Sequence, residues 1–357
     1  MTFENTHRPP VRLAILGLGR AVFEEHWPIL KNHPSLFKLV AACDLIKERR
    51  DIIAKDAPDC KMFRRVSDML DERDIDAVVV ATPTSLHVKH ALMSLKRGFW
   101  TILETPMALT PDEAQIVRGQ ALKSKNRIIV LQRGSFDPDF ELAKQMMSDE
   151  RLGTIHEIHI RREDYIRRDD WQCVKRLGGG AAYYAMTDLM IQALRLLPSR
   201  PIQMWSDLKR LASLGDAEDY ARTLLKTREQ VTAEVIFNGG SLPNLHGPSF
   251  EIHGSRGVFR VNPGEKEGSI TMIDPKFKFP RRRSSVRTPQ LLDMHEQFPV
   301  VEASVSLPKN SQLGMPAFWK NVYQTVRTAA TFPLALEDSI EAVRLAHLMK
   351  QTSPYGK

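Results

Sequence analysis

The segment "VRLAILGLGR", from Val11 to Arg20, begins with a short apolar run and ends in two spaced glycines. The run predicts a buried strand, and Gly17 and Gly19 lie where that strand would turn into a helix. The first glycine permits the tight turn, and the second lets a pyrophosphate approach the backbone amides. We therefore predict a dinucleotide site here that includes Arg20, although Val22 holds the position of the third glycine in the G-x-G-x-x-G pattern.

Further apolar runs alternate with amphipathic segments of helical length over the first 130 residues. They are "FKLVAAC" from Phe37, "CKMF" from Cys60, "DAVVVA" from Asp76, "FWTILE" from Phe99 and "RIIVLQ" from Arg127. Near-continuous apolar strands separated by helices are typical of a parallel sheet covered on both faces. Right-handed crossovers then give a doubly wound Rossmann fold, which we expect to occupy residues 1–132.

The pattern changes after that point and favours a second domain at residues 133–357. The expected elements are a helix after Asp137, a strand at 153–163, a helix after the glycines 178–180, strands between 201 and 274, and helices from about Gln312 and Leu336. Strands joined directly by turns predict a mainly antiparallel sheet. The fold class is therefore α/β, with the final helices able to pack back toward the first domain.

Composition limits the classes of function. No window approaches eighteen consecutive apolar residues, so no membrane span is expected. The first ten residues lack the pattern of a secretory signal, which predicts a cytoplasmic protein. The three cysteines are widely spaced and odd in number, which fits neither a disulfide framework nor a zinc site. We expect reduced thiols and no metal.

The net charge of +8 favours an anionic partner. The basic residues are mostly scattered, and aromatic residues are not interleaved with them, so a nucleic-acid platform is not expected. An anionic cofactor or other small molecule fits better. The one basic cluster, "KFKFPRRRSSVR" at 276–287, is interpreted as a solvated surface loop.

Asp44 closes the second predicted strand, about 25 residues after the glycines, where a carboxylate can bind the ribose hydroxyls. A carboxylate would repel the 2′-phosphate of NADP, so NAD is the favoured cofactor. Lys47, Arg49 and Arg50 follow closely and keep NADP as the alternative. A simple strand-end cap is the other interpretation of Asp44.

The segment "VVVATPTSLHVKHAL" places polar residues at the end of the fourth predicted strand. Ligands of doubly wound sheets lie beyond the carboxyl ends of the strands, so these residues are expected to face the cofactor. They are Thr82, Pro83, Thr84 and His87. His87 has a second interpretation, as a residue on a helix surface.

Nine segments in order resemble one family. They are "GLGR", "AACD", "DAVVVATPTSLHVKHAL", "ILETPMALT", "DERLGTIHEI", "LGGGAAYYAMTDLM", "GDAEDYARTLL", "FEIHGSRGVFRV" and "LALEDSIEAVRLAHLMKQT". Over essentially its whole length the chain is similar to the glucose-fructose oxidoreductase and inositol dehydrogenase family, Gfo/Idh/MocA. The resemblance implies a Rossmann domain followed by an α/β domain whose open, mainly antiparallel sheet often serves for oligomerisation. A homo-oligomer, dimer or tetramer, is therefore expected.

At three positions the chain departs from the residues that the family usually has. In the family the fifth strand ends in Glu-Lys-Pro, whose lysine contacts nicotinamide and substrate, and the corresponding residues here are Glu104, Thr105 and Pro106. The resemblance therefore implies that Glu104 and Thr105 border the cofactor. Tyr184 and Asp188 stand where the family has an aspartate and a histidine after the glycine triplet. The usual lysine, histidine and first aspartate are absent together.

A rebuilt site is one hypothesis. On a helix Tyr184 and Asp188 would share one face, so Asp188 can serve as a base with Tyr184 as donor or relay, while Thr105 offers a hydrogen bond without charge. The opposing hypothesis is that these side chains fill an abandoned pocket. Substrate contacts are expected among Arg133, Asp164, Arg168, Trp171, Gln172 and Lys175. Lys175 or Arg176 is a candidate to replace the missing charge. A salt-bridged loop is the alternative there.

These observations favour an NAD-dependent oxidoreductase that acts on a sugar, inositol or related polyol by hydride transfer. Two alternatives stay open. One is a redox-neutral lyase or glycosidase that retains its NAD, and the other is a non-catalytic sensor or partner subunit that binds dinucleotide or sugar.

Overall fold

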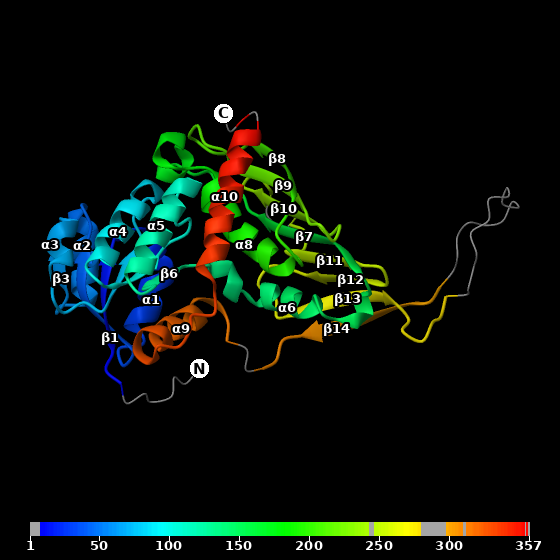
Figure 1. Ribbon diagram of the computed structural model, residues 1–357, viewed down its shortest axis with the longest axis horizontal. Helices are drawn as coiled ribbons and strands as arrows, with labels where there is room; N and C mark the ends of the chain where they lie inside the picture. The colour runs from blue at the N-terminus through cyan, green and yellow to red at the C-terminus, as the bar shows by residue number, and fades with distance from the viewer. Residues whose placement is uncertain (1–7, 243–245, 280–297, 310–311, 354, 356–357) are drawn as a thin grey trace, which may run out of the picture.

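The computed structural model describes residues 8–242, 246–279, 298–309, 312–353 and 355. Two sheets lie side by side in it, and the last helix, α10, runs between them (Figure 1). Most of the basic cluster, 280–287, lies outside the described residues. None of the described helices combines the length and apolar character needed to cross a membrane.

The first sheet is parallel, with strand order β3-β2-β1-β4-β5-β6. Its strands are β1 Val11–Leu16, β2 Phe37–Cys43, β3 Lys61–Phe63, β4 Ala77–Val80, β5 Trp100–Leu103 and β6 Ile128–Val130. The helices between them are a π-helical turn Val22–His26 that leads into α1 Trp27–Lys31, α2 Lys47–Asp56, α3 Val66–Leu70, α4 His87–Lys96 and α5 Pro111–Lys123. All six predicted strands and the doubly wound fold are confirmed.

Apolar side chains cover both faces of this sheet because neighbouring residues of a strand point to opposite sides. Leu13 and Ile15 join one core with α1 and with Phe318 and Trp319 of α9 (Gly314–Thr328). Ala14 and Leu16, on the other side, join a core built from α3, α4 and α5. A late segment of the chain therefore completes the core of the first sheet.

The second sheet has eight strands in the order β14-β13-β12-β11-β7-β10-β9-β8. They are β7 Ile155–Glu163, β8 Gln203–Lys209, β9 Tyr220–Lys226, β10 Thr232–Asn238, β11 Phe250–Gly254, β12 Gly257–Val261, β13 Glu267–Ile273 and β14 Val300–Ser306. Only β7 and β10 run parallel to each other; the other neighbours are antiparallel. The mainly antiparallel sheet is confirmed, and β14 extends it beyond the region predicted from the sequence.

Three helices pack on one face of the second sheet: α6 Pro138–Met146, α8 Met186–Leu196 and α10 Leu336–Thr352. The short helix α7 Ala181–Tyr184 precedes α8. Ile158 and Ile160 of β7 are buried against these helices. His159, between them, belongs to the opposite face, where the side chains are mostly polar.

Candidate active site

The loop after β1 has the shape that a pyrophosphate needs. Gly17 has φ +90°, and a Cβ on it would lie 2.6 Å from the carbonyl oxygen of Ala81, so only glycine fits there. A Cβ on Gly19 would meet nothing within 4 Å, which leaves the backbone open to a close ligand. The amide of Gly17 donates to the carbonyl of Cys43 and ties the loop to β2.

Asp44 holds the same loop from the end of β2. Its carboxylate accepts hydrogen bonds from the amides of Leu18, at 2.7 Å, and Ile46, at 2.8 Å. Arg49 lies 3.7 Å away and gives the carboxylate a cationic neighbour. Asp44 thus caps the backbone and borders the cavity at once, so the two interpretations of this residue do not exclude each other.

A cavity of about 330 Å³ lies at the carboxyl ends of β1, β2, β4 and β5. It is lined by all ten residues that the sequence predicts for the cofactor: Gly17, Gly19, Arg20, Asp44, Thr82, Pro83, Thr84, His87, Glu104 and Thr105. Trp171, predicted for the substrate, and Gln172 line it from the second domain. The residues therefore fit a dinucleotide, with an open glycine loop at one end and the end of β5 at the other.

His87 is buried between two turns rather than exposed on a helix surface. Its Nδ1 lies 2.7 Å from the carbonyl oxygen of Pro106, and its Nε2 lies 2.6 Å from that of Thr82. Burial lowers the pKa of His87, although both carbonyl contacts act in the opposite direction. The imidazole holds the loops after β4 and β5 together at the wall of the cavity.

A second cavity, of about 270 Å³, adjoins the first and shares Arg20, Glu104, Thr105 and Gln172 with it. Its remaining walls come mostly from the second domain: Arg133, Arg162, Ile166, Arg168, Tyr184, Asp188 and Phe237. A molecule in this cavity would therefore lie next to the end of β5. The arrangement is that of a substrate site beside a cofactor site.

Asp188 is buried at the wall of the second cavity. Both of its carboxylate oxygens lie 3.2 Å from the amide nitrogen of Gly134, and Oδ2 lies 3.1 Å from the Arg162 guanidinium. Arg162 extends from β7, on the same face as Ile158 and Ile160. A cation thus stands in the pocket that lacks the family's lysine.

The helix after the glycine triplet is interrupted, which the sequence analysis did not predict. α7 ends at Tyr184 and α8 starts at Met186, so Tyr184 and Asp188 belong to two helices instead of one face of a single helix. Both nevertheless line the second cavity. The Arg168 guanidinium lies 4.6 Å from the centre of the Tyr184 ring, and burial raises the pKa of the Tyr184 hydroxyl.

Thr105 and Glu104 are both engaged with protein groups. The Thr105 hydroxyl donates a hydrogen bond to the carbonyl of Leu131, and this contact joins the turn after β5 to the end of β6. The Glu104 carboxylate pairs with the buried His26 imidazole. Thr105 therefore places the turn, and its hydroxyl proton is already used.

Two predicted substrate residues have different positions. Arg133 lines the second cavity and forms an ion pair with Glu25 at 2.7 Å. Lys175 lines neither cavity: its ammonium donates to the carbonyl of Tyr355 and lies 4.3 Å from the centre of that ring. The expectation that Lys175 replaces the missing charge is wrong, because Tyr355 near the end of the chain binds it.

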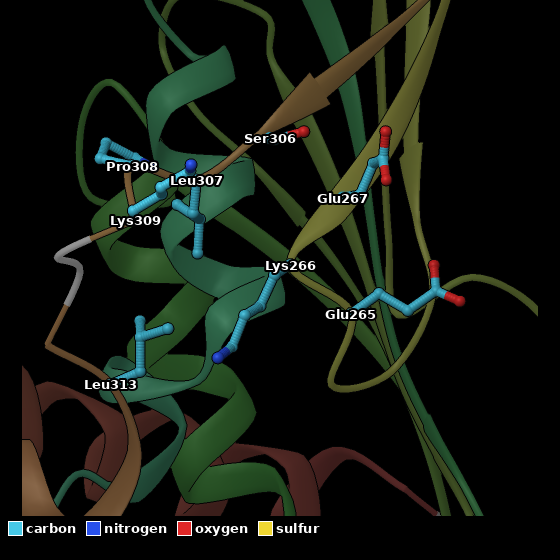
Figure 2. A pocket seen from close by; sticks show the side chains of 8 residues that line it. All are labelled: Glu265, Lys266, Glu267, Ser306, Leu307, Pro308, Lys309 and Leu313. Atoms are coloured by element: carbon cyan, nitrogen blue, oxygen red, sulfur yellow. The ribbon is translucent and has the colours of Figure 1, made fainter. Parts of the chain in front are cut away.

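A hollow of about 620 Å³ lies elsewhere, at the edge of the second sheet near β13 and β14. Figure 2 shows Lys266 and Leu313 extending into it, while Glu265 points to the other side. None of the residues predicted for the site is among those that line it. We therefore place the site at the two adjoining cavities.

Comparison with known proteins identifies the family. A model of an oxidoreductase family with an NAD-binding Rossmann fold, GFO_IDH_MocA, matches residues 11–132, and its GFO/IDH/MocA C-terminal domain matches 140–260. An uncharacterised oxidoreductase of Schizosaccharomyces pombe is 29% identical over 282 residues, covering 75% of this chain and 76% of that protein.

Two relatives cover almost the whole chain. The scyllo-inositol 2-dehydrogenase (NADP⁺) IolW of Bacillus subtilis is 20% identical over 96% of this chain and 94% of its own. The crystal structure of an NAD-binding protein from Listeria innocua superposes with a TM-score of 0.80 at 19% identity, over 97% of this chain and 98% of that one. The two domain models together span most of the sequence. This chain therefore belongs to the Gfo/Idh/MocA family of oxidoreductases and has its NAD-binding Rossmann domain at the N-terminal side.

Proposed function

We propose that this protein oxidises or reduces a hydroxyl-bearing carbon of a sugar, inositol or related polyol, with NAD(P) as the partner in hydride transfer. The observation that carries the proposal is the cofactor-shaped cavity that adjoins a second cavity containing the Asp188–Arg162 pair. The match to the scyllo-inositol dehydrogenase of Bacillus subtilis supports the substrate class.

NAD(P), when bound, takes up or gives the hydride, so the chain has to manage the hydroxyl proton. Asp188 is the group we assign to that proton, because it is buried, faces the cavity and is oriented by Gly134 and Arg162. The guanidinium of Arg162 offers the positive charge that stabilises a developing alkoxide. The Tyr184 hydroxyl, whose pKa is raised, stays protonated and is available as a hydrogen-bond donor.

NAD is the cofactor we propose, in preference to NADP. The Asp44 carboxylate borders the cavity and repels a 2′-phosphate, and the Leu18 and Ile46 amides keep it in place. Arg49 lines the same cavity and favours NADP. Turnover with both cofactors decides between them.

We further propose that residues 1–132 hold the cofactor and 133–357 hold the substrate and a second copy of the chain. The polar face of the second sheet, with Trp205 exposed on β8, is the surface we assign to a dimer or tetramer. The three cysteines are buried and free, which suits a protein of the reducing cytoplasm.

The test is turnover of a panel of inositols, hexoses and sugar acids with NAD⁺ or NADP⁺, followed at the nicotinamide absorbance. Asp188→Asn is expected to lower kcat by at least about 100-fold, the usual worth of a general base. The matched control is Asp338→Asn, since Asp338 also pairs with an arginine, Arg200 at 2.8 Å, but lies outside both cavities. Equal activity of Asp188→Asn and the control would remove Asp188 from the mechanism.

Binding assays separate the alternatives. If the protein binds NADH and a polyol without turnover, the sensor role replaces the enzymatic one. If it turns substrate over with no net change in absorbance, a redox-neutral lyase or glycosidase reaction replaces the dehydrogenase reaction.

A further inference from the structure

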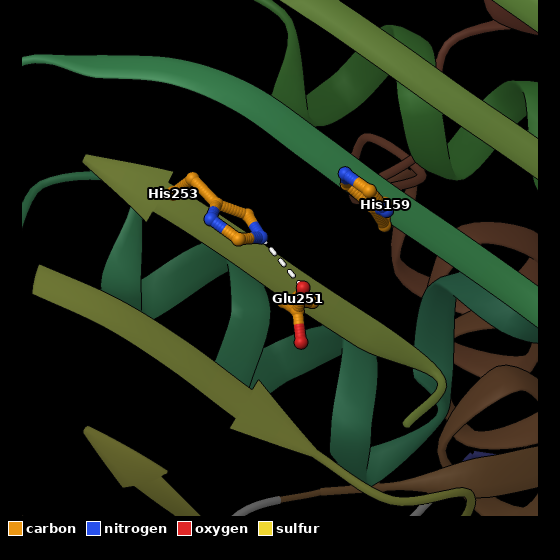
Figure 3. Close-up of side chains that lie close together, drawn as sticks. All are labelled: His159, Glu251 and His253. Atoms are coloured by element: carbon orange, nitrogen blue, oxygen red, sulfur yellow. Dashed lines mark hydrogen bonds and ion pairs between the residues drawn. The ribbon is translucent and has the colours of Figure 1, made fainter. Parts of the chain in front are cut away.

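Three side chains of metal-binding type meet on the polar face of the second sheet, on the side away from the active site. They are His159 of β7 and Glu251 and His253 of β11, and one ligand atom from each lies within 4.8 Å of the others (Figure 3). His159 and Glu251 are directly paired across the two antiparallel strands. Glu251 and His253 are two residues apart and therefore point to the same face.

We propose that His159, Glu251 and His253 bind one divalent transition-metal ion, for which Zn²⁺ is the best-matched choice. Two imidazoles and one carboxylate form a ligand set that Zn²⁺ uses when a fourth position stays open. Imidazole nitrogen selects transition metals over Mg²⁺ and Ca²⁺, which prefer sites made only of oxygen ligands. The proposal is independent of the active site.

The surroundings of His159 suit a ligand histidine. Its Nδ1 lies 3.3 Å from the buried Glu234 carboxylate, the arrangement that orients metal-bound imidazoles. Its Nε2 is buried and makes no hydrogen bond within the described part of the chain, although Glu157 Oε1 lies 2.9 Å away outside hydrogen-bond geometry. Nε2 is therefore the atom that we assign to the ion.

Arg161 has to move when the ion binds. Its guanidinium lies 3.1 Å from His159 Nδ1, a contact that needs the lone pair of that nitrogen. Coordination through Nε2 makes Nδ1 a donor toward Glu234, so Arg161 loses this acceptor. Glu234 itself is 3.9 Å from Arg161 and is the carboxylate to which the guanidinium can turn.

The other two ligands are already oriented. Arg260 donates to Oε2 of Glu251, which leaves Oε1 toward His253. His253 Nε2 lies 2.6 Å from that Oε1 and shares a proton with it, and the ion would take the place of this proton. The charges around the three ligands balance without an ion. The neighbourhood holds three carboxylates, those of Glu157, Glu234 and Glu251, and three guanidiniums, those of Arg161, Arg222 and Arg260. Affinity must therefore come from the ligand bonds.

The experiment is calorimetric titration of the chelator-treated full chain with Zn²⁺. We expect saturable binding of one ion per chain, weakened by at least about tenfold in His159→Gln and in His253→Gln. Glu234→Gln removes the carboxylate that orients His159 and also the charge paired with Arg222, and is expected to lose about tenfold. The control is His347→Gln on α10, where the imidazole contacts Gln351, and this variant is expected to bind Zn²⁺ like the wild type.

Two further measurements keep the result interpretable. Thermal denaturation without metal shows whether each variant is folded, and sedimentation shows whether its assembly has changed. With Co²⁺ in place of Zn²⁺, the wild type is expected to develop visible d–d absorption that His253→Gln lacks. Absence of saturable Zn²⁺ binding to the wild type, or wild-type affinity in both histidine variants, would overturn the proposal.

Discussion

The guanidinium of Arg162 lies 3.1 Å from the carboxylate of Asp188, and the pair joins strand β7 to helix α8 at the wall of the second cavity. The cation thus comes from the second domain instead of the turn after β5, where Thr105 stands. In the proposed mechanism, this carboxylate and guanidinium do the work of the family's histidine and lysine. The pair has consequences for both stability and turnover.

Arg162→Gln is expected to lower kcat/KM by about 100-fold, because a charge that stabilises a developing alkoxide is lost. It should also lower the free energy of unfolding by about 1–3 kcal/mol, since the Asp188 carboxylate is only 9% exposed and loses a charged partner. Steady-state kinetics and urea denaturation measure the two effects. Arg200→Gln, which breaks the ion pair with Asp338, is the control and is expected to leave kcat/KM unchanged. Equal kinetics of the two variants would contradict the role of Arg162.

The two glycines of the cofactor loop are predicted to respond differently to alanine. Gly17→Ala should destabilise the fold by about 1–3 kcal/mol, because the positive φ and the Ala81 carbonyl leave no room for a Cβ. Gly19→Ala should leave stability within about 0.5 kcal/mol, since its Cβ meets open space. Its NADH affinity should nevertheless fall by about tenfold or more, because the methyl group occupies the path of the pyrophosphate. Thermal denaturation measures the stability of the two variants, and fluorescence titration measures their NADH affinity. Normal NADH binding by Gly19→Ala would argue against this loop as the cofactor site.

The buried Asp137 carboxyl is expected to make the free energy of unfolding depend on pH. Burial, reinforced by the neighbouring Asp188, raises the pKa of Asp137 to about 6 from a usual value of 3.8. Between about pH 4 and pH 6 the folded state keeps a proton that the unfolded state has released, so stability falls as the pH rises through this window. The loss is about 3 kcal/mol. Asp137→Asn should lack it, and identical pH profiles of unfolding for variant and wild type would contradict the assignment.

Trp319 of α9 is expected to contribute much of the packing energy between α9 and the first sheet. Trp319→Ala should cost about 3–5 kcal/mol of unfolding free energy, because the side chain is fully buried beside Phe37 and Phe318. Trp319→Phe should cost less than about 1.5 kcal/mol, since the indole nitrogen has no hydrogen-bond partner among the described residues and a ring is kept. Urea denaturation of both variants provides the measurement; similar losses for the two would mean that packing around this ring is not what holds α9.

The fold was largely predictable because its signals are local. Six apolar runs mark the first sheet, and the strands around 220–261 follow turn residues closely. β14 was not predicted, because its side chains are exposed on one face and it pairs only with β13, at the sheet edge. The interruption of the helix at Ala185 was also missed, since "GAAYYAMTDL" contains neither proline nor an internal glycine that would mark it.

The candidate site, like the fold, could be predicted from the sequence only in part. The cofactor residues follow strand ends and could be found from sequence order alone, and the structure gathers all ten around one cavity. Arg162 was missed because the letters of "HIRRE" alone do not distinguish it from its neighbour Arg161. Its spacing of two from Ile160 was the available signal, since it places Arg162 on the buried face. Lys175 was misplaced because its partner, Tyr355, is 180 residues away in the sequence.

The position of α9 has a consequence for synthesis. The ribosome releases the strands of the first sheet early, yet one face of that sheet is covered only in part, by α1, until Phe318, Trp319 and Tyr323 have left the exit tunnel. Apolar surface of the first domain is therefore exposed while the ribosome translates some two hundred further residues. Chaperone binding during that interval is expected at the α9 face of the sheet, and a ribosome-bound chain arrested before residue 314 is the species on which to look for it.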